Sequence, residues 1–178
     1  MKKDRLKARI NRYLKKGQLI RRQEFTKLKE PFLTKARKNF TIANLLFRIS
    51  EQGDVKKALN LPSGFETYDW VIISSYYSMY TSSLAALAKL GFKSKSHAAT
   101  IAVLESFYVS EKKLEQKHID KLTKAYTLSE ELITRLIRSK ERRETAQYDA
   151  TPAISREMAV SALKDAEEFV MRVEEILS

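Results

Sequence analysis

The chain of 178 residues contains no cysteine, which excludes disulfide bonds, thiolate zinc sites and a cysteine nucleophile. It has only two histidines, His97 and His118, so a histidine-rich metal cluster is excluded as well. Glycine-rich phosphate loops, metal-binding motifs and catalytic triads are also missing. We therefore predict that the protein uses neither a metal nor a cofactor.

Long apolar runs are missing too. The longest apolar stretch, residues 71–90, contains five serines, three tyrosines and Lys89. It is too polar to span a bilayer and is typical of a buried core helix. The charged start of the chain has no apolar segment behind it, so it does not resemble a secretory signal. We expect a cytoplasmic protein that does not enter a membrane.

The net charge of +12 is concentrated in one part of the sequence. Residues 1–40 hold fifteen Lys and Arg against three acidic residues, and the rest of the chain is balanced. Such a segment favours a polyanion such as nucleic acid, through counterion release and long-range attraction. The alternative is a solvated helix that only improves solubility. A membrane-surface role is disfavoured, because Leu6, Ile10 and Leu14 form only a narrow apolar stripe.

The apolar pattern is helical, and no segment shows the sustained alternation of a strand. The four glycines and three prolines leave few breaks. We predict an all-α fold in which residues 30–178 form a single-domain antiparallel helical bundle of about five to six helices. Residues 1–29 are predicted to form a basic N-terminal helical arm. The helices are expected over about residues 3–16, 31–53, 66–90, 96–108 and 117–144, with a last helix after an N-cap at Ser155.

The most suggestive chemistry lies in Arg143-Glu-Thr-Ala-Gln-Tyr148-Asp149. An arginine can hold a phosphate with two hydrogen bonds, and a phenol can donate to a phosphate or stack on a base. On a regular helix these two side chains would point about 140° apart. They share a cleft only if the helix ends before Tyr148 or a second subunit completes the site. The alternative is a structural pair, with the ring in the core and the guanidinium bonded to a carboxylate such as Asp69.

Other residues have two interpretations each. Arg135, Arg138 and Arg142 lie on one helical stripe and either line a phosphate groove or are neutralised by Glu131 and Glu141. His97 starts a helix, where it either contacts an anion or is a satisfied structural group. His118 is interpreted as a surface residue. The tyrosines of the central helix are interpreted as core or subunit interface; they are Tyr76, Tyr77 and Tyr80.

Several segments, taken in order, resemble the HEPN family (higher eukaryotes and prokaryotes nucleotide-binding domain). No single segment is specific, and the resemblance rests on the ordered set, which covers about residue 17 to the end. The segments are Gly17-Gln-Leu-Ile-Arg21, Tyr68-Asp-Trp70, Ser75-Tyr-Tyr-Ser-Met-Tyr80, Leu84-Ala-Ala-Leu-Ala-Lys-Leu-Gly91, Lys95-Ser-His-Ala-Ala-Thr-Ile101, Arg143-Glu-Thr-Ala-Gln-Tyr-Asp149 and Ala166-Glu-Glu-Phe-Val170.

The resemblance implies a dimer in which two arginine-bearing helices face one cleft. It also implies frequent pairing with a small nucleotidyltransferase, often as a toxin–antitoxin couple. Active members are metal-independent ribonucleases with Arg, four to six residues, then His. Arg143 matches that arginine, and Tyr148 stands where the histidine would be. Because a phenol has an ordinary pKa of about 10, it is a poor general base at neutral pH. Related toxins also carry a tyrosine here that partner enzymes modify with adenylate, and Tyr148 is its nearest equivalent.

Two functions follow from these expectations. The first is an RNA-associated protein, either a metal-independent ribonuclease or the toxin component of a HEPN/nucleotidyltransferase pair. The second is a non-catalytic nucleotide-binding or protein-interaction module that partners a nucleotidyltransferase. The candidate catalytic residues are Arg143 and Tyr148. The candidate phosphate- or nucleotide-binding residues are Asp69, His97, Arg138 and Arg142.

Overall fold

The computed structural model describes residues 2–142 and 154–178, with side chains described for residues 5–134 and 154–178. The described part is almost entirely helical, which confirms the predicted all-α class. A 3₁₀ segment, Gln23–Leu28, precedes the second helix, and a π-helical segment, Glu105–Val109, extends the fifth. The helices are α1 (Lys2–Lys15), α2 (Lys29–Glu51), α3 (Gly53–Ala58), α4 (Tyr68–Lys89), α5 (His97–Leu104), α6 (Gln116–Arg142) and α7 (Arg156–Leu177).

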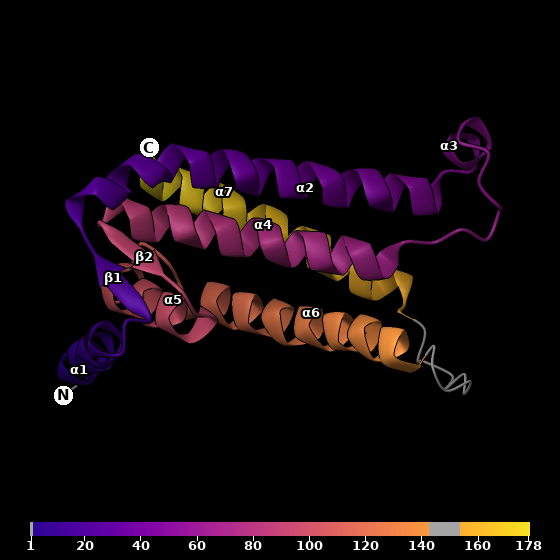
Figure 1. Cartoon of the computed structure of the whole chain (residues 1–178). Coiled ribbons are helices and arrows are strands. Elements are labelled where there is room, and N and C mark those ends of the chain that lie inside the picture. Colours follow the sequence, from indigo (N-terminus) through magenta and orange to yellow (C-terminus); the bar gives the residue numbers. More distant parts are fainter. Residues whose placement is uncertain (1, 143–153) are drawn as a thin grey trace.

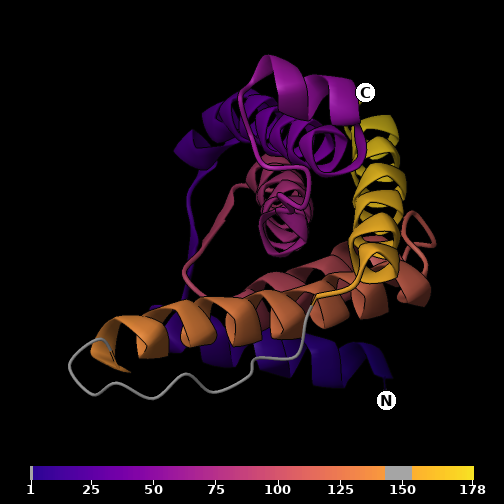
Figure 2. The ribbon, with the colours of Figure 1, turned by 90° about the vertical axis from the view of Figure 1, so that its right-hand side faces the viewer.

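Helix α4 lies at the centre of the bundle. It contacts α2, α6 and α7, which surround it on three sides (Figures 1 and 2). In Figure 1 the long helices α2, α4, α6 and α7 alternate in direction, as expected for a bundle, whereas Figure 2 shows α6 crossing α4 at a steep angle. In Figure 2 the carboxyl-terminal half of α6 lies well away from α7. The contact of α4 with α2 is more extensive than its contact with α6.

Small side chains explain why α2 and α4 pack so closely. Ala36 and Ala43 on α2 are fully buried against the central helix. The Ser78 hydroxyl donates to the Ala36 carbonyl at 2.9 Å, so it bonds directly to the neighbouring backbone. Ser82 and Ser83 donate to the Met79 carbonyl within their own helix. Each hydroxyl is thereby satisfied inside the core, which removes the cost of burying it.

The predicted helix starts at Ser96 and Ser155 are confirmed. The Ser96 hydroxyl accepts from the Ala99 backbone N–H at 3.2 Å, at the start of α5. The Ser155 hydroxyl accepts from the Met158 N–H at 3.3 Å, at the start of α7. Both are N-caps of the ordinary kind, in which a side-chain oxygen satisfies a free N–H of the first turn.

A two-stranded ribbon was not predicted. Strands β1 (Leu19–Arg21) and β2 (Phe92–Ser94) pair antiparallel, with Arg21 opposite Phe92. Three residues are too few to show the alternation that identifies a strand in sequence. Gly91 makes the turn into β2 with φ of 74°, and a Cβ there would lie 3.1 Å from the Arg22 carbonyl oxygen. The close approach of the Gly91 backbone to the Arg22 backbone therefore requires glycine.

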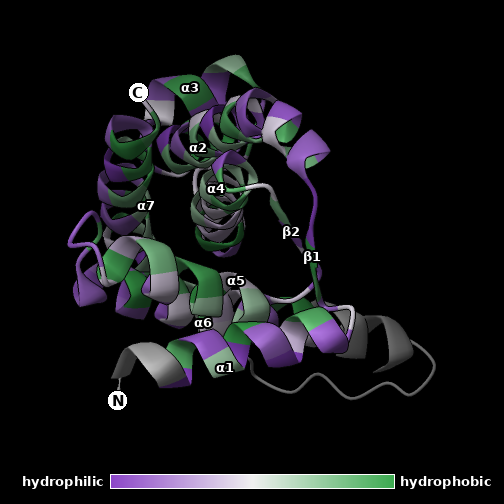
Figure 3. Ribbon diagram, turned by 90° about the vertical axis from the view of Figure 1, so that its left-hand side faces the viewer, coloured by the Kyte–Doolittle hydropathy of each residue, from purple (hydrophilic) through white to green (hydrophobic). Residues whose placement is uncertain are grey.

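The ribbon and α1 pack on the bundle. Ile10 of α1 and Leu19 of β1 are buried in the same hydrophobic cluster as Tyr76 and Phe169. Figure 3 shows α1 lying beneath α5 and α6. The proposed boundary at residue 29 stays a prediction. Within the described ranges, no helix combines the length and apolar character needed to cross a bilayer.

Candidate functional site

The segment with the predicted catalytic residues, Arg143 and Tyr148, lies outside the described residues. Arg138 and Arg142 belong to the last turns of α6, where the structure describes the backbone. Ile154, the first described residue after Arg142, packs with Tyr68 at the start of α4. The end of α6, the start of α7 and the start of α4 all lie at the same end of the bundle (Figure 1). Candidate Asp69 is therefore at the end of the molecule where the chain leaves α6 and enters α7.

Asp69 itself makes a local contact. One of its carboxylate oxygens accepts from the Trp70 backbone N–H at 2.9 Å in the first turn of α4. An acidic residue is favoured at this position by the helix dipole. A pairing of Asp69 with Arg143, or a role in binding a nucleotide, stays a prediction.

Glu51 connects three helices at this end, and sequence reasoning missed it. Its carboxylate accepts from the Tyr68 hydroxyl at 2.7 Å and from Arg156 Nε at 2.7 Å. These two hydrogen bonds lower the pKa of Glu51, and the bond to Glu51 raises the pKa of Tyr68 to about 12. The contact fixes the start of α7 against α2 and α4. Its members lie far apart in sequence, so no local motif reveals it.

His97 lies in a cluster with three tyrosines from two other helices. Its ring stacks on Tyr126 of α6, with centroids 4.1 Å apart and planes 10° apart. Tyr80 and Tyr76 of α4 lie 6.1 and 6.2 Å from it. We call these four residues the imidazole–tyrosine cluster. Tyr77 extends it outward, 5.2 Å from Tyr76 and 41% exposed.

The cluster is uncharged at neutral pH. Both ring nitrogens of His97 are buried, and among the described residues neither has a hydrogen-bond partner. Desolvation lowers the pKa of His97 to about 4. Burial also raises the pKa values of Tyr76 and Tyr80, so both phenols keep their protons. The cluster offers stacking surfaces and neutral donors, not a charged anchor. Contact between His97 and a phosphate stays a prediction.

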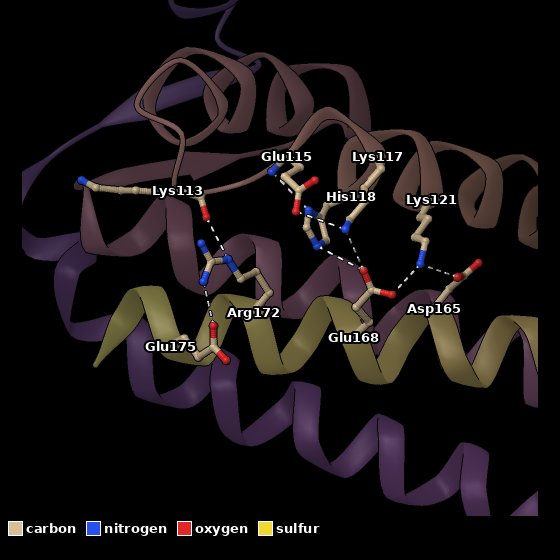
Figure 4. A network of polar contacts seen from close by, with 9 residues as sticks. All are labelled: Lys113, Glu115, Lys117, His118, Lys121, Asp165, Glu168, Arg172 and Glu175. Atoms are coloured by element: carbon tan, nitrogen blue, oxygen red, sulfur yellow. Dashed lines mark hydrogen bonds and ion pairs between the residues drawn. The ribbon is translucent and has the colours of Figure 1, made fainter.

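The interpretation of His118 as a surface residue was wrong. His118 is only 3% exposed, and its Nδ1 accepts from the Glu115 backbone N–H at 3.2 Å (Figure 4). Nε2 lies 3.4 Å from the Glu168 carboxylate, which also accepts from Lys121 at 2.7 Å. The imidazole thus caps the first turn of α6 and connects it to α7. Histidine is an unusual residue for this cap, so the sequence did not reveal it.

Basic residues form an exposed surface on α1, the turn after it and the ribbon. Its exposed cations include Arg5, Arg12, Lys15, Lys16, Arg21, Lys93 and Lys95. Among the side chains that the structure describes, no carboxylate lies within 4.0 Å of Arg12, Lys15 or Lys16. Arg9 differs, since it pairs with Glu105 at 2.6 Å. Unpaired cations on one helix are suited to the phosphates of a nucleic acid.

The described residues include no group of three His, Asp or Glu side chains placed to hold a metal ion. A family model described as the HEPN domain matches residues 43–176. No curated protein matches the chain.

The buried histidines predict a pH dependence of stability. His97 and His118 both have pKa values lowered below 6.5 by desolvation. The unfolded chain then binds protons more readily than the folded protein, so the free energy of unfolding falls as the pH falls below about 6.5. His97→Phe keeps the stacked ring but cannot be protonated. Between pH 7 and pH 5, the free energy of unfolding of His97→Phe should therefore fall by about 1 kcal/mol less than that of the wild type, after allowance for solvent screening.

The measurement is urea unfolding of both proteins at pH 7 and pH 5. The control is Lys124→Gln, which changes an exposed residue of α6 outside the cluster. An equal loss of stability in the wild type and His97→Phe would show that His97 does not resist protonation.

Proposed function

The chain belongs to the HEPN domain family, and from this membership we propose that it is an RNA-associated HEPN protein. The family match supports association with nucleotides or RNA in general. The observation that favours RNA is the exposed cation surface at the end of α1 and in the turn after it, where Arg12, Lys15 and Lys16 have no carboxylate partner among the described side chains. A protein that only needs solubility does not require its whole excess charge within forty residues.

We further propose that the protein is a homodimer in which the second copy covers the exposed face of α4. Trp70 and Tyr77 are 47% and 41% exposed. They are seven residues apart, which places them on one face of the helix. Ile42 and Leu45 of the adjacent α2 are also exposed. Large apolar side chains exposed on neighbouring helices favour a protein–protein contact. In the family arrangement, such a dimer brings two arginine-bearing segments into one cleft.

Within that cleft, Arg143 is the proposed phosphate-binding residue. If the protein cleaves RNA, the guanidinium stabilises charge that builds on the scissile phosphate, and no metal is required. Tyr148 then positions the sugar or base, because a phenol of ordinary pKa is a poor proton acceptor at neutral pH. Arg138 and Arg142 precede Arg143 on α6 and are proposed to extend the phosphate contact.

A second candidate function rests on Tyr148 itself. With a tyrosine where active relatives carry histidine, the protein is instead a non-catalytic module that partners a small nucleotidyltransferase. Tyr148 would then be the residue that accepts adenylate. Finding a small nucleotidyltransferase reading frame beside this one in the genome would favour this alternative.

RNA association predicts a steep salt dependence that α1 controls. The logarithm of the RNA affinity should fall linearly with the logarithm of the salt concentration. Replacing Arg12, Lys15 and Lys16 by Gln should reduce the slope by about 2 for single-stranded RNA, since each lost phosphate contact removes about 0.7. Point substitutions are preferable to deleting the segment, because Leu19 is 1% exposed and its loss would open the core.

The matched control removes three exposed lysines elsewhere, Lys57, Lys124 and Lys164. It lowers the net charge equally but should leave the slope unchanged. A shallow slope in the wild type, or equal effects of the two triple variants, would count against α1 as the RNA-binding surface.

The cleft predicts a dimer and an essential arginine. Light scattering at micromolar concentration should give twice the mass of the chain, and Trp70→Glu should give a monomer.

In RNA cleavage assays, Arg143→Ala should lower the rate by about two to three orders of magnitude, the usual effect of losing one such donor. Tyr148→Phe should have a smaller effect, because the ring that positions the RNA remains.

Met171→Glu is the control for association, since Met171 is 56% exposed on α7. A monomeric wild type would contradict the shared cleft. Cleavage that survives Arg143→Ala, or that EDTA abolishes, would contradict the proposed chemistry. A dimer that binds RNA without cleaving it would support the non-catalytic alternative.

A further inference from the structure

A groove of about 780 Å³ separates α1 from the π-helical segment Glu105–Val109. Its floor is apolar and includes Ile10 and Phe92, both buried. Its polar lining consists of neutral hydrogen-bonding side chains, cations and two carboxylates, Glu105 and Glu111, which pair with Arg9 and Lys113 at 2.6 Å each. Those used below are Asn11, Ser106, Ser110, Gln116, Lys7 and Arg21. The volume lies in the usual range for sites that hold small organic groups.

The Arg21 guanidinium lines this groove and lies over an aromatic ring. Its guanidinium carbon lies 5.1 Å from the centroid of the Phe92 ring, which in turn packs against Phe107 at 5.6 Å. The pairing of β1 with β2 places Arg21 directly opposite Phe92 and fixes this contact. Arg21 is exposed, so the ring supports one side of the guanidinium while solvent can reach the other. Arginine planes of this kind stack on unpaired bases.

The rim and floor fit a base better than an apolar helix face. A base has two apolar faces and a polar edge, which match an apolar floor ringed by amides and hydroxyls. Ser110 and Gln116 already donate to the Ser106 carbonyl and to Asp120. An apolar helix face would cover the Asn11 amide and the Ser106 hydroxyl without offering them partners, at a cost for each. The ion pair of Arg9 with Glu105, at 2.6 Å, joins α1 to the π-helical segment, and both residues line the groove. A helix ridge would meet this pair, whereas separate bases can lie on either side of it.

Resting on the proposed RNA association, we propose that this groove holds unpaired bases of single-stranded RNA, with one base stacked on Arg21. Lys7 of α1 lines the groove, and the phosphates run from it to Arg12 and Lys15, exposed cations of α1 that lie outside the groove. This combination of a cationic wall with stacking surfaces is the general chemistry of single-strand binding. Helix α1 lies near the start of α6, whereas Arg143 follows the end of α6 in sequence (Figure 1).

The test compares a short oligouridine with an abasic oligonucleotide that carries the same number of phosphates. The wild type should bind the oligouridine about fivefold to a hundredfold more tightly, the range expected for one stacked base. Arg21→Lys keeps the charge but loses the flat surface, and Asn11→Trp fills the groove from an exposed position. Both should reduce the affinity ratio toward one. Arg22→Lys is the matched control and should keep the ratio, because Arg22 is exposed and does not line the groove.

Thermal melts establish that each variant is folded. If the wild type binds neither oligonucleotide, the proposed RNA association fails. If it binds both equally, or if both groove variants keep the wild-type ratio, RNA association stands and the groove is not a base site. Binding of an acidic amphipathic peptide that Asn11→Trp abolishes, with an unchanged base-to-abasic ratio, would assign the groove to a protein partner and overturn the proposal.

Discussion

The burial of α4 is the constraint on which the rest of the structure depends. This helix contacts α2, α6 and α7, yet it carries serines, threonines and tyrosines as well as aliphatic residues. Several of its buried hydroxyls donate to backbone carbonyls, as Ser78 does to Ala36 and Thr81 to Tyr77, whereas Ser75 Oγ has no hydrogen-bond partner among the described residues. Their small size lets α2 approach on one side, while the tyrosines fill the wider space toward α5 and α6. The same helix thus produces a tight seam and an aromatic cluster.

Carboxylates fix the helices around this core. Glu51 holds the start of α7 to α2 and α4 through Arg156 and Tyr68, and Glu168 holds α7 to α6 through Lys121 and His118. The first contact lies at the end of the bundle where α6 ends and α7 begins. Helix α1 lies near the other end of α6, where that helix begins (Figure 1). The proposed RNA contacts would therefore span the length of the bundle.

Much of the fold could be predicted because it depends on local signals. Helical spacing gave the long helices, and Ser96 and Ser155 marked two helix starts that the structure confirms. The family resemblance was confirmed by the match over residues 43–176. The β1–β2 ribbon, the stacking of His97 on Tyr126 and the burial of His118 were missed, because each depends on residues brought together from different elements. The candidate site was predictable only in part: Asp69 and His97 were named, but Glu51 and Arg21 acquire their roles from contacts that no sequence pattern shows.

The central claim is that RNA binds the cation surface of α1 and the ribbon. Hydrogen exchange of the full chain, with and without single-stranded RNA, tests it most directly. The account predicts slower exchange of backbone amides in α1, β1, β2 and the Glu105–Val109 segment when RNA is bound. Protection confined to the outer face of α7 around Met171, or no protection at RNA concentrations that saturate binding, would contradict it.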